Sequence, residues 1–361
     1  MKEIAKQSGW SLGTVSRVLR DEPGVNEKAR TEVLETARAL NYHKNEAASL
    51  LRLKQPDGIL LVVLADGCSI YAELSTLLEA ALREKEKRVT RLVVSADEDE
   101  VLKAMAQIRR SLPSLVVFLG VRRENLRRLY GRISVPAISV GASLNDFNDE
   151  YLCSCSLPDT ELAQQGIEWL FESGKSTIGV LLNDRQKYSE LADRFLGVQY
   201  AFYSRDQVFS AKTRSVLCPS TVQGGYEGLK QLARQVPDLD GVFVMDQNQA
   251  IGALRAAADL GRKVPDDLAV LAMDLRDESK FTIPRLSGCR RNLEEDARTL
   301  CQTICRMQSD YEYFMDASRL HLDASWSMQW EESCPRPQSL NEPAVPAAAP
   351  QSLESISNQP D

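Results

Sequence analysis

The feature that most constrains the fold is an alternation of apolar runs and helical stretches that begins at Gly58. Residues 59–64 (Ile-Leu-Leu-Val-Val-Leu) are continuously apolar, as expected of a parallel strand buried on both faces. Further strands are expected at 91–94, 115–119 and 137–140, with helices between them at about 71–86, 98–111 and 123–131. Strands that alternate with helices in this way form a parallel sheet in an α/β domain.

The same alternation is repeated in the second half of the chain. Helices are expected at about 159–173, 190–204, 222–235 and 247–260, and strands at 177–182, 215–217, 241–245, 268–273, 286–289 and 320–322. Two consecutive α/β halves predict a bilobed body over residues 58–332, with a cleft between its lobes. From Ser333 the composition shifts to Pro, Ser, Ala, Asn and Gln, so residues 333–361 are expected to form a disordered tail.

Residues 1–44 have a different, all-helical pattern. Ser11 and Asn26 are natural N-caps, each directly before a helical stretch. Three short helices are expected at 2–8, at about 12–19 and at 27–40. Two short helices separated by a glycine turn, with a third that closes the small core, are the helix-turn-helix plan of DNA-binding domains.

The charge distribution agrees with such a head. The whole chain has a net charge of -7, but residues 1–55 hold ten basic and seven acidic residues, which gives +3 for the head and leaves -10 for the rest. A short basic segment on an acidic body is typical of a chain that uses the segment to bind a partner.

Several classes of protein are disfavoured by what the sequence lacks. No apolar run is long enough to span a membrane, and the first residues lack the apolar segment of a signal peptide, so we expect a cytoplasmic protein. The eight cysteines are scattered without a CxxC pair and there are two histidines, so we expect reduced, buried thiols and no metal site. No catalytic motif occurs in a fitting context, so we expect neither an enzyme nor a cofactor.

Specific residues in the head and body resemble the LacI/GalR family of bacterial transcription regulators. In the head these are Ile4-Ala5, Gly9, Ser11, Thr14-Val15-Ser16-Arg17-Val18-Leu19 and Gly24-Val25, followed by Asn41-Tyr42 and Asn45-x-x-Ala48-x-x-Leu51. In the body they are Arg194-x-x-Gly197, Asp246 with Gly252-Ala253-Leu254, Val264-Pro265-Asp266-Asp267-Leu268 and Asp274. The resemblance covers about residues 1–330. It implies a helix-turn-helix head, a periplasmic-binding-protein-like body with two parallel-sheet subdomains, a homodimer, and operator DNA and a sugar-like effector as partners.

The resemblance also implies roles for residues of the second helix, which lies in the major groove in this fold. Leu12 and Gly13 occupy the positions used for base choice, and Leu12 can make apolar contact with a thymine methyl. Arg17 is the candidate for a bidentate contact to guanine, or else for a phosphate contact. The groups expected to position the head on phosphates are Ser11, Thr14, Ser16 and Asn26.

Residues 45–57 are expected to form a hinge helix and linker. A helix of about nine residues is not stable alone in water, so 45–53 would form only against a partner. The resemblance implies that Asn45, Ala48 and Leu51 enter the minor groove of DNA, with Leu51 as the wedge that opens a base step. The other reading is a linker helix that docks on the body. Lys44 stands where the family often has Pro, which leaves the start of this helix less defined.

Four body residues are candidates for binding the effector. The family places Arg194 and Asp274 in the effector pocket, and Asp246 follows an apolar strand, where it either faces the ligand or caps the next helix. Tyr71 either stacks on a ring of the ligand or packs in the core. Met245, Leu275 and Gly141 replace polar residues common in the family. These departures leave open a modified or less hydroxylated ligand, or a vestigial pocket in a protein controlled by a partner protein. A sugar-binding protein without DNA function is a further alternative.

Overall fold

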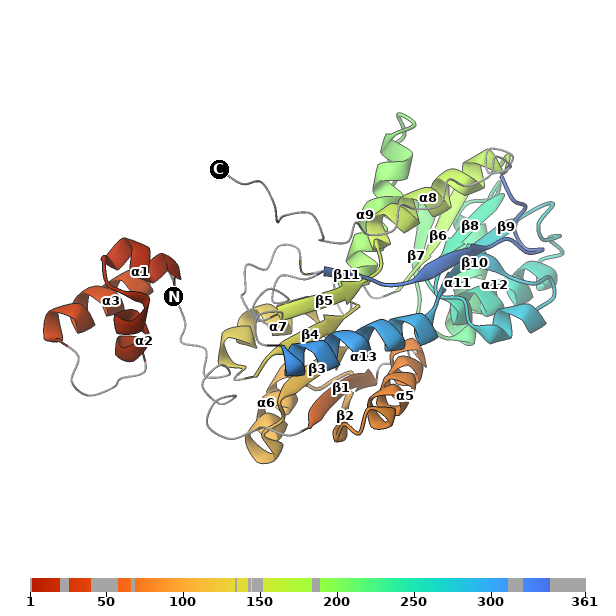
Figure 1. The fold of residues 1–361 in the computed structure, drawn as a ribbon. Coiled ribbons are helices and arrows are strands. Elements are labelled where there is room, and N and C mark those ends of the chain that lie inside the picture. The colour runs from red at the N-terminus through yellow and green to blue at the C-terminus, as the bar shows by residue number, and fades with distance from the viewer. Residues whose placement is uncertain are drawn as a thin grey trace, which may run out of the picture. The chain divides into compact units, whose positions relative to one another are not determined.

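The N-terminal head is a three-helix domain (Figure 1). The computed structural model describes residues 2–19, 26–39, 58–65, 69–133, 135–141, 144, 152–183, 189–310 and 321–337. The head consists of α1 (Lys2–Ser8), α2 (Leu12–Leu19) and α3 (Glu27–Ala39), which confirms the three predicted helices. Its core contains Ile4, Val15, Val18, Val33 and Ala37. The predicted hinge helix, with Asn45, Ala48 and Leu51, lies outside the described residues.

The body is divided into two compact units. Unit 1 contains the chain up to Ser156 together with Leu293–Asp323, and unit 2 contains Leu157–Asn292 together with the chain from Ala324 onward. The chain therefore passes from one unit to the other three times.

Unit 1 has a six-stranded sheet in the order β11-β5-β4-β3-β1-β2, in which every neighbouring pair is parallel. Ile59 at the start of β1 is paired with both Val89 and Leu115, so three neighbouring strands begin at the same level. The strands are β1 (Ile59–Ala65), β2 (Val89–Ser95), β3 (Leu115–Leu119), β4 (Ala137–Val140), β5 (Leu152–Ser156) and β11 (His321–Asp323). The helices are α5 (Ser69–Glu84), α6 (Glu100–Ser111), α7 (Arg123–Leu129) with a 3-10 turn at Tyr130–Arg132, and α13 (Leu293–Ser309).

Unit 2 has a second six-stranded sheet, in the order β12-β10-β9-β8-β6-β7. Its neighbouring strands are parallel except for β12, which runs antiparallel to β10. The strands are β6 (Ile178–Leu182), β7 (Ser215–Leu217), β8 (Gly241–Val244), β9 (Ala269–Ala272), β10 (Ser287–Arg291) and β12 (Trp326–Gln329). The helices are α8 (Asp159–Glu172), α9 (Ser189–Tyr203), α10 (Ala211–Arg214), α11 (Val222–Gln235) and α12 (Gln247–Asp259), with a 3-10 turn at Asp277–Phe281.

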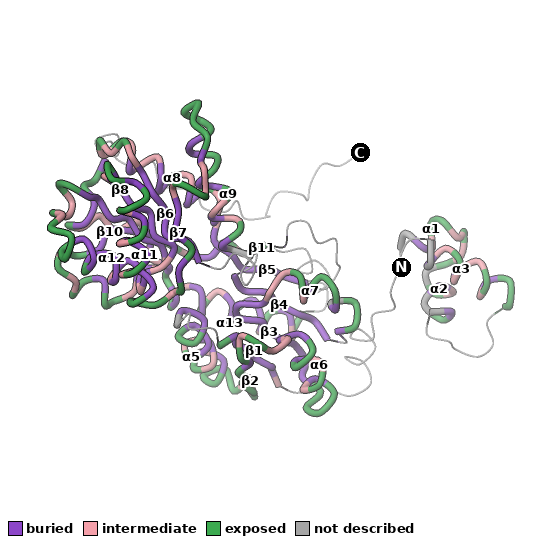
Figure 2. The backbone as a smooth tube through the Cα atoms, turned by 180° about the vertical axis from the view of Figure 1, so that it is seen from behind, coloured by how far each residue is buried: buried purple, intermediate pink, exposed green. Residues whose placement is uncertain are grey.

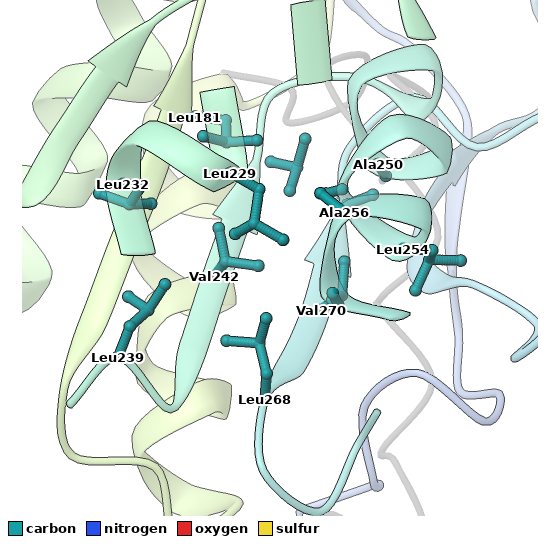
Figure 3. Close-up of a cluster of buried hydrophobic side chains, with 14 of the residues drawn as sticks. Leu181, Leu229, Leu232, Leu239, Val242, Ala250, Leu254, Ala256, Leu268 and Val270 are labelled. Atoms are coloured by element: carbon teal, nitrogen blue, oxygen red, sulfur yellow. The ribbon is translucent and has the colours of Figure 1, made fainter. Parts of the chain in front are cut away.

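The core of unit 2 lies between its sheet and helices α11 and α12 (Figure 3). Leu229 of α11 and Val242 of β8 are fully buried there. The two helices cross in close contact, because a Cβ at Gly252 would lie 1.9 Å from the carbonyl oxygen of Val222. In both units the central strands are buried and the helices expose their outer faces, whereas β2, β11 and β12 at the sheet edges are largely exposed or partly buried (Figure 2).

The structure corrects the sequence analysis in two respects. Strands β5 and β12 and helix α13 were not predicted. The start of the tail was placed at Ser333, but Ser333 and Cys334 are fully buried, and Ser333 Oγ donates to the carbonyl of Val270 at 2.7 Å. Residues 333–337 are therefore part of the described fold. The seven described cysteines are all free and six are buried, as expected.

Candidate functional sites

Helix α2 has a buried face and a polar outer face. Ser11 caps the helix, because the backbone N–H of Thr14 donates to Ser11 Oγ at 3.1 Å. Val15 and Val18 are buried in the head, whereas Gly13 and Arg17 are exposed. The backbone of α2 thus carries the predicted base-choice residues Leu12 and Gly13 in its first turn, and Ser16 also lies on this helix. The side chains of Leu12 and Ser16 lie outside the described residues.

Asn26 caps the third helix of the head. The backbone N–H of Lys28 donates to Asn26 Oδ1 at 2.8 Å, and the N–H of Arg30 donates to the Asn26 carbonyl at 3.0 Å. The cap fixes the start of α3, the helix whose Val33 and Ala37 share the head core with Val15 and Val18 of α2. Trp10 adds to this support, since its indole N–H donates to Glu32 of α3 at 2.8 Å.

In unit 2, Arg194 is the centre of a buried polar cluster at the carboxyl edge of the sheet. It projects from α9 and is 3% exposed. Its Nε donates to Asp159 Oδ1 at 2.7 Å, and its two terminal nitrogens bind both carboxylate oxygens of Asp274 at 2.7 and 3.0 Å. Its Nη1 also donates to the carbonyl of Met245 at 2.9 Å. Burial alone would lower the pKa of Arg194, but Asp274 and Asp159 outweigh burial and raise this pKa well above its ordinary value.

Asp246 lies next to this cluster, directly after β8. It is the N-cap of α12, because its Oδ1 accepts the backbone N–H of Gln249 at 3.0 Å. Its other oxygen accepts the Nδ2 of Asn183, which follows β6, at 3.1 Å. Asp246 and Asp274 are only partly buried. The carboxyl edge of this sheet therefore presents two carboxylates whose positions are held by the protein.

Tyr71 lies in unit 1, on α5, and is 4% exposed. It packs over Gly120 and Gly141, which follow β3 and β4 and have φ values of +84° and +106°. A Cβ at Gly141 would lie 2.0 Å from the Tyr71 hydroxyl, and a Cβ at Gly120 would lie 2.8 Å from the Tyr71 ring. The tyrosine thus fills the space that a side chain at position 141 would need. A contact between Tyr71 and an effector stays a prediction.

The structure brings together only some of the predicted effector residues. Arg194, Asp246 and Asp274 share one sheet edge of unit 2, where the Met245 carbonyl joins Arg194 to the strand that precedes Asp246. The sequence analysis missed Asp159, which is the first residue of α8 and is 5% exposed. An acidic residue at a helix start is common because it complements the helix dipole, so the sequence gave no reason to single it out.

Comparisons with known proteins agree with both parts of the chain. The family of bacterial regulatory proteins, lacI family, matches residues 1–45, and the periplasmic binding protein-like domain matches residues 167–313. Catabolite control protein A of Staphylococcus epidermidis is 22% identical over 86% of this chain and 92% of its own length. The HTH-type transcriptional regulator GntR of Pseudomonas aeruginosa is 28% identical over 84% of this chain and 88% of its own length.

Solved structures share the fold. A transcriptional regulator CelR–cellobiose complex has a TM-score of 0.67 at 19% identity and covers 91% of this chain and 98% of its own. The lac repressor dimer bound to operator has a TM-score of 0.65 at 18% identity, covering 91% and 97%. Within the described part of the chain, no helix combines the length and apolar character needed to cross a membrane. With a lacI-family head joined to a periplasmic-binding-protein-like body, the chain belongs to the LacI family of bacterial transcription regulators.

Proposed function

We propose that the protein is a repressor that binds operator DNA as a homodimer through α2. The observation that carries this proposal is the division of α2 into a buried face, with Val15 and Val18, and an exposed face that includes Gly13 and Arg17. A capped helix with an exposed polar face, and with a glycine in its first turn that allows close approach, is suited to the major groove. The protein would act in the cytoplasm, on the DNA of the nucleoid.

The test is a selection of bound fragments from genomic DNA, followed by affinity measurements on the selected operator. Arg17→Ala should weaken specific binding by roughly 5-fold to 150-fold, the effect of about 1–3 kcal/mol expected for a guanine contact. Lys28→Ala is the matched control, because it removes the same charge from α3, where Lys28 is exposed. Equal losses in the two variants, or equal losses on operator and random DNA, would contradict base recognition by Arg17.

The homodimer is supported by large apolar side chains that are exposed to solvent and whose burial against a second subunit would be favourable. Phe281 and Ile283 of unit 2 are 83% and 94% exposed, and Val93 on the edge strand β2 of unit 1 is 60% exposed. Neighbouring exposed apolar side chains such as Phe281 and Ile283 can contribute to an association surface. In analytical ultracentrifugation, the double variant Phe281→Glu with Ile283→Glu should contain a larger fraction of monomer than the wild type. Phe281→Leu should leave that fraction unchanged.

We propose further that a polyhydroxylated small molecule controls DNA binding by contacting Asp246 and Asp274. Partly buried carboxylates held by other protein groups are good acceptors for hydroxyl donors, and Arg194 and Asn183 supply that support here. Calorimetry against sugars, sugar phosphates and sugar acids is the direct test. Asp246→Asn should lower the affinity of any ligand found, whereas Asp266→Asn, an exposed aspartate in the turn before β9, should not.

The alternative is a vestigial pocket in a regulator controlled by a partner protein. It is favoured by the apolar character of three positions: Met245 and Leu275 are buried, and the space beside Gly141 is filled by Tyr71. This alternative holds if the calorimetric panel gives no binding and if Asp246→Asn and Asp274→Asn both regulate normally in cells.

A further inference from the structure

Unit 1 has an unusually basic surface at the amino edge of its sheet. Six basic residues lie in the last turns of the helices that lead into β2, β3 and β4, or directly after them, and we refer to them together as the amino-edge face: Lys85, Lys87, Arg88, Arg109, Arg110 and Arg132. All are exposed except the partly buried Lys87. The acidic residues beside them in the sequence are Glu84 and Glu86, and the end of α13, which contacts Ser114 through Gln308, brings the exposed Asp310 to the same edge. The face is therefore positive in a chain whose net charge is -7.

Ion pairs distinguish this face from the opposite edge of the same sheet. At the carboxyl edge, Arg122 is paired with Glu100, Arg128 with Asp99, and Lys103 with Glu98. At the amino edge, no ion pair joins Lys85, Lys87, Arg109, Arg110 or Arg132 to any other residue that the structure describes. The helix dipole favours a basic residue in a last helical turn, but it does not require five exposed positive charges around one edge.

The chain from the head enters unit 1 at this same edge. Gly58 precedes β1, and its carbonyl accepts both the backbone N–H and the Oγ of Ser114, at 2.8 and 2.9 Å. The N–H of Ile59 donates to the carbonyl of Arg88 at 2.7 Å. Arg88 is thus directly beside the point where the chain enters, and Arg110 is four residues before Ser114.

The tether between head and body limits how far bound DNA can lie from this face. The head ends its last helix at Ala39, and residues 40–57 connect it to Gly58. A fully extended segment of this length spans at most about 65 Å, and any compact conformation spans less. The tether therefore allows a duplex held by α2 to reach the amino-edge face.

We propose that the amino-edge face is a second DNA contact surface, which binds the phosphate backbone of the duplex that the head holds. This inference rests on the proposed DNA-binding function. Exposed arginine and lysine side chains can neutralise phosphates and release counterions, which strengthens binding without reading sequence. The face would act equally on operator and on random DNA, and its contribution would vanish at high salt.

The test is the salt dependence of DNA affinity in the full-length protein. Each lost phosphate contact lowers the slope of log K against log[salt] by about 0.9, so Arg109→Ala with Arg110→Ala should lower it by roughly 1.8. Between 50 and 200 mM salt the wild type would then lose about tenfold more affinity than the variant. The matched control is Lys212→Ala with Arg234→Ala, which removes two exposed charges from helix ends in unit 2 and should leave the slope unchanged.

The outcomes separate this inference from the proposed function. If the wild type binds operator and Arg17→Ala weakens that binding, but the Arg109/Arg110 variant keeps the wild-type slope, the second contact surface is refuted and the proposed function stands. If the wild type binds no DNA at any salt concentration, the proposed function itself fails, and this inference fails with it. A lowered slope on operator and random DNA alike, with the control unchanged, supports the face.

Discussion

Replacing Arg194 should show whether the polar cluster of unit 2 also contributes to the stability of the fold. Arg194→Met keeps much of the side-chain volume but removes every hydrogen bond that the guanidinium makes. It leaves Asp159, 5% exposed, and Asp274, with a side chain 16% exposed, facing each other without a cation. It also leaves the carbonyl of Met245 without the donor at 2.9 Å.

The size of the effect follows from this burial. Removing one partner of a buried ion pair costs about 3–5 kcal/mol, because the remaining charges stay buried without compensation. For a domain of this size, each kcal/mol lowers Tm by about 2–4 °C, so a fall of roughly 10 °C is expected. Adding Asp159→Asn and Asp274→Asn to Arg194→Met removes the stranded charges. This triple variant should therefore be more stable than Arg194→Met alone.

Tryptophan fluorescence during thermal unfolding can report on unit 2 selectively. Of the four tryptophans, Trp169, Trp326 and Trp330 lie in unit 2, and Trp10 lies in the head. A Trp10→Phe background therefore removes the signal of the head. A fall of less than about 2 °C in Tm for Arg194→Met, or a triple variant less stable than that single variant, would refute the argument from a buried ion pair.

Three further results are expected. Ser11→Ala and Asn26→Ala should each destabilise the head by about 1 kcal/mol through the lost cap, measured by circular dichroism of thermal unfolding, and an unchanged melting curve would exclude the caps. In native protein at pH 8, a disulfide reagent should react with Cys305 before the other described cysteines, because they are buried; burial raises the pKa of Cys218, for example, to about 12. Ending the chain after residue 337 should leave the Tm unchanged, whereas ending it after Glu332 should lower it, since Ser333 is then lost.

Much of the fold could be predicted because local patterns decide it. The continuously apolar run that became β1 and the caps at Ser11 and Asn26 were read directly from neighbouring residues. Strand β5 was not predicted because its sequence, Leu-Cys-Ser-Cys-Ser, lacks the β-branched residues that are typical of strands. Helix α13 did carry a signal, a stripe of Leu293, Ala297, Leu300 and Ile304 at helical spacing, but its many charged residues obscured it.

The sequence by itself determined most of the helices and strands, the order of the two α/β halves and the helix-turn-helix head. Through the family resemblance it also placed Arg194 and Asp274 in one effector pocket. Only the tertiary structure decided that Asp159 completes their cluster, that Tyr71 fills the space beside Gly141, and that exposed basic residues gather at the edge of the sheet where Gly58 lies. The physical reason is sequence distance. Asp159 and Asp274 lie 35 and 80 residues from Arg194, and the register of parallel strands, which no local pattern encodes, brings them together.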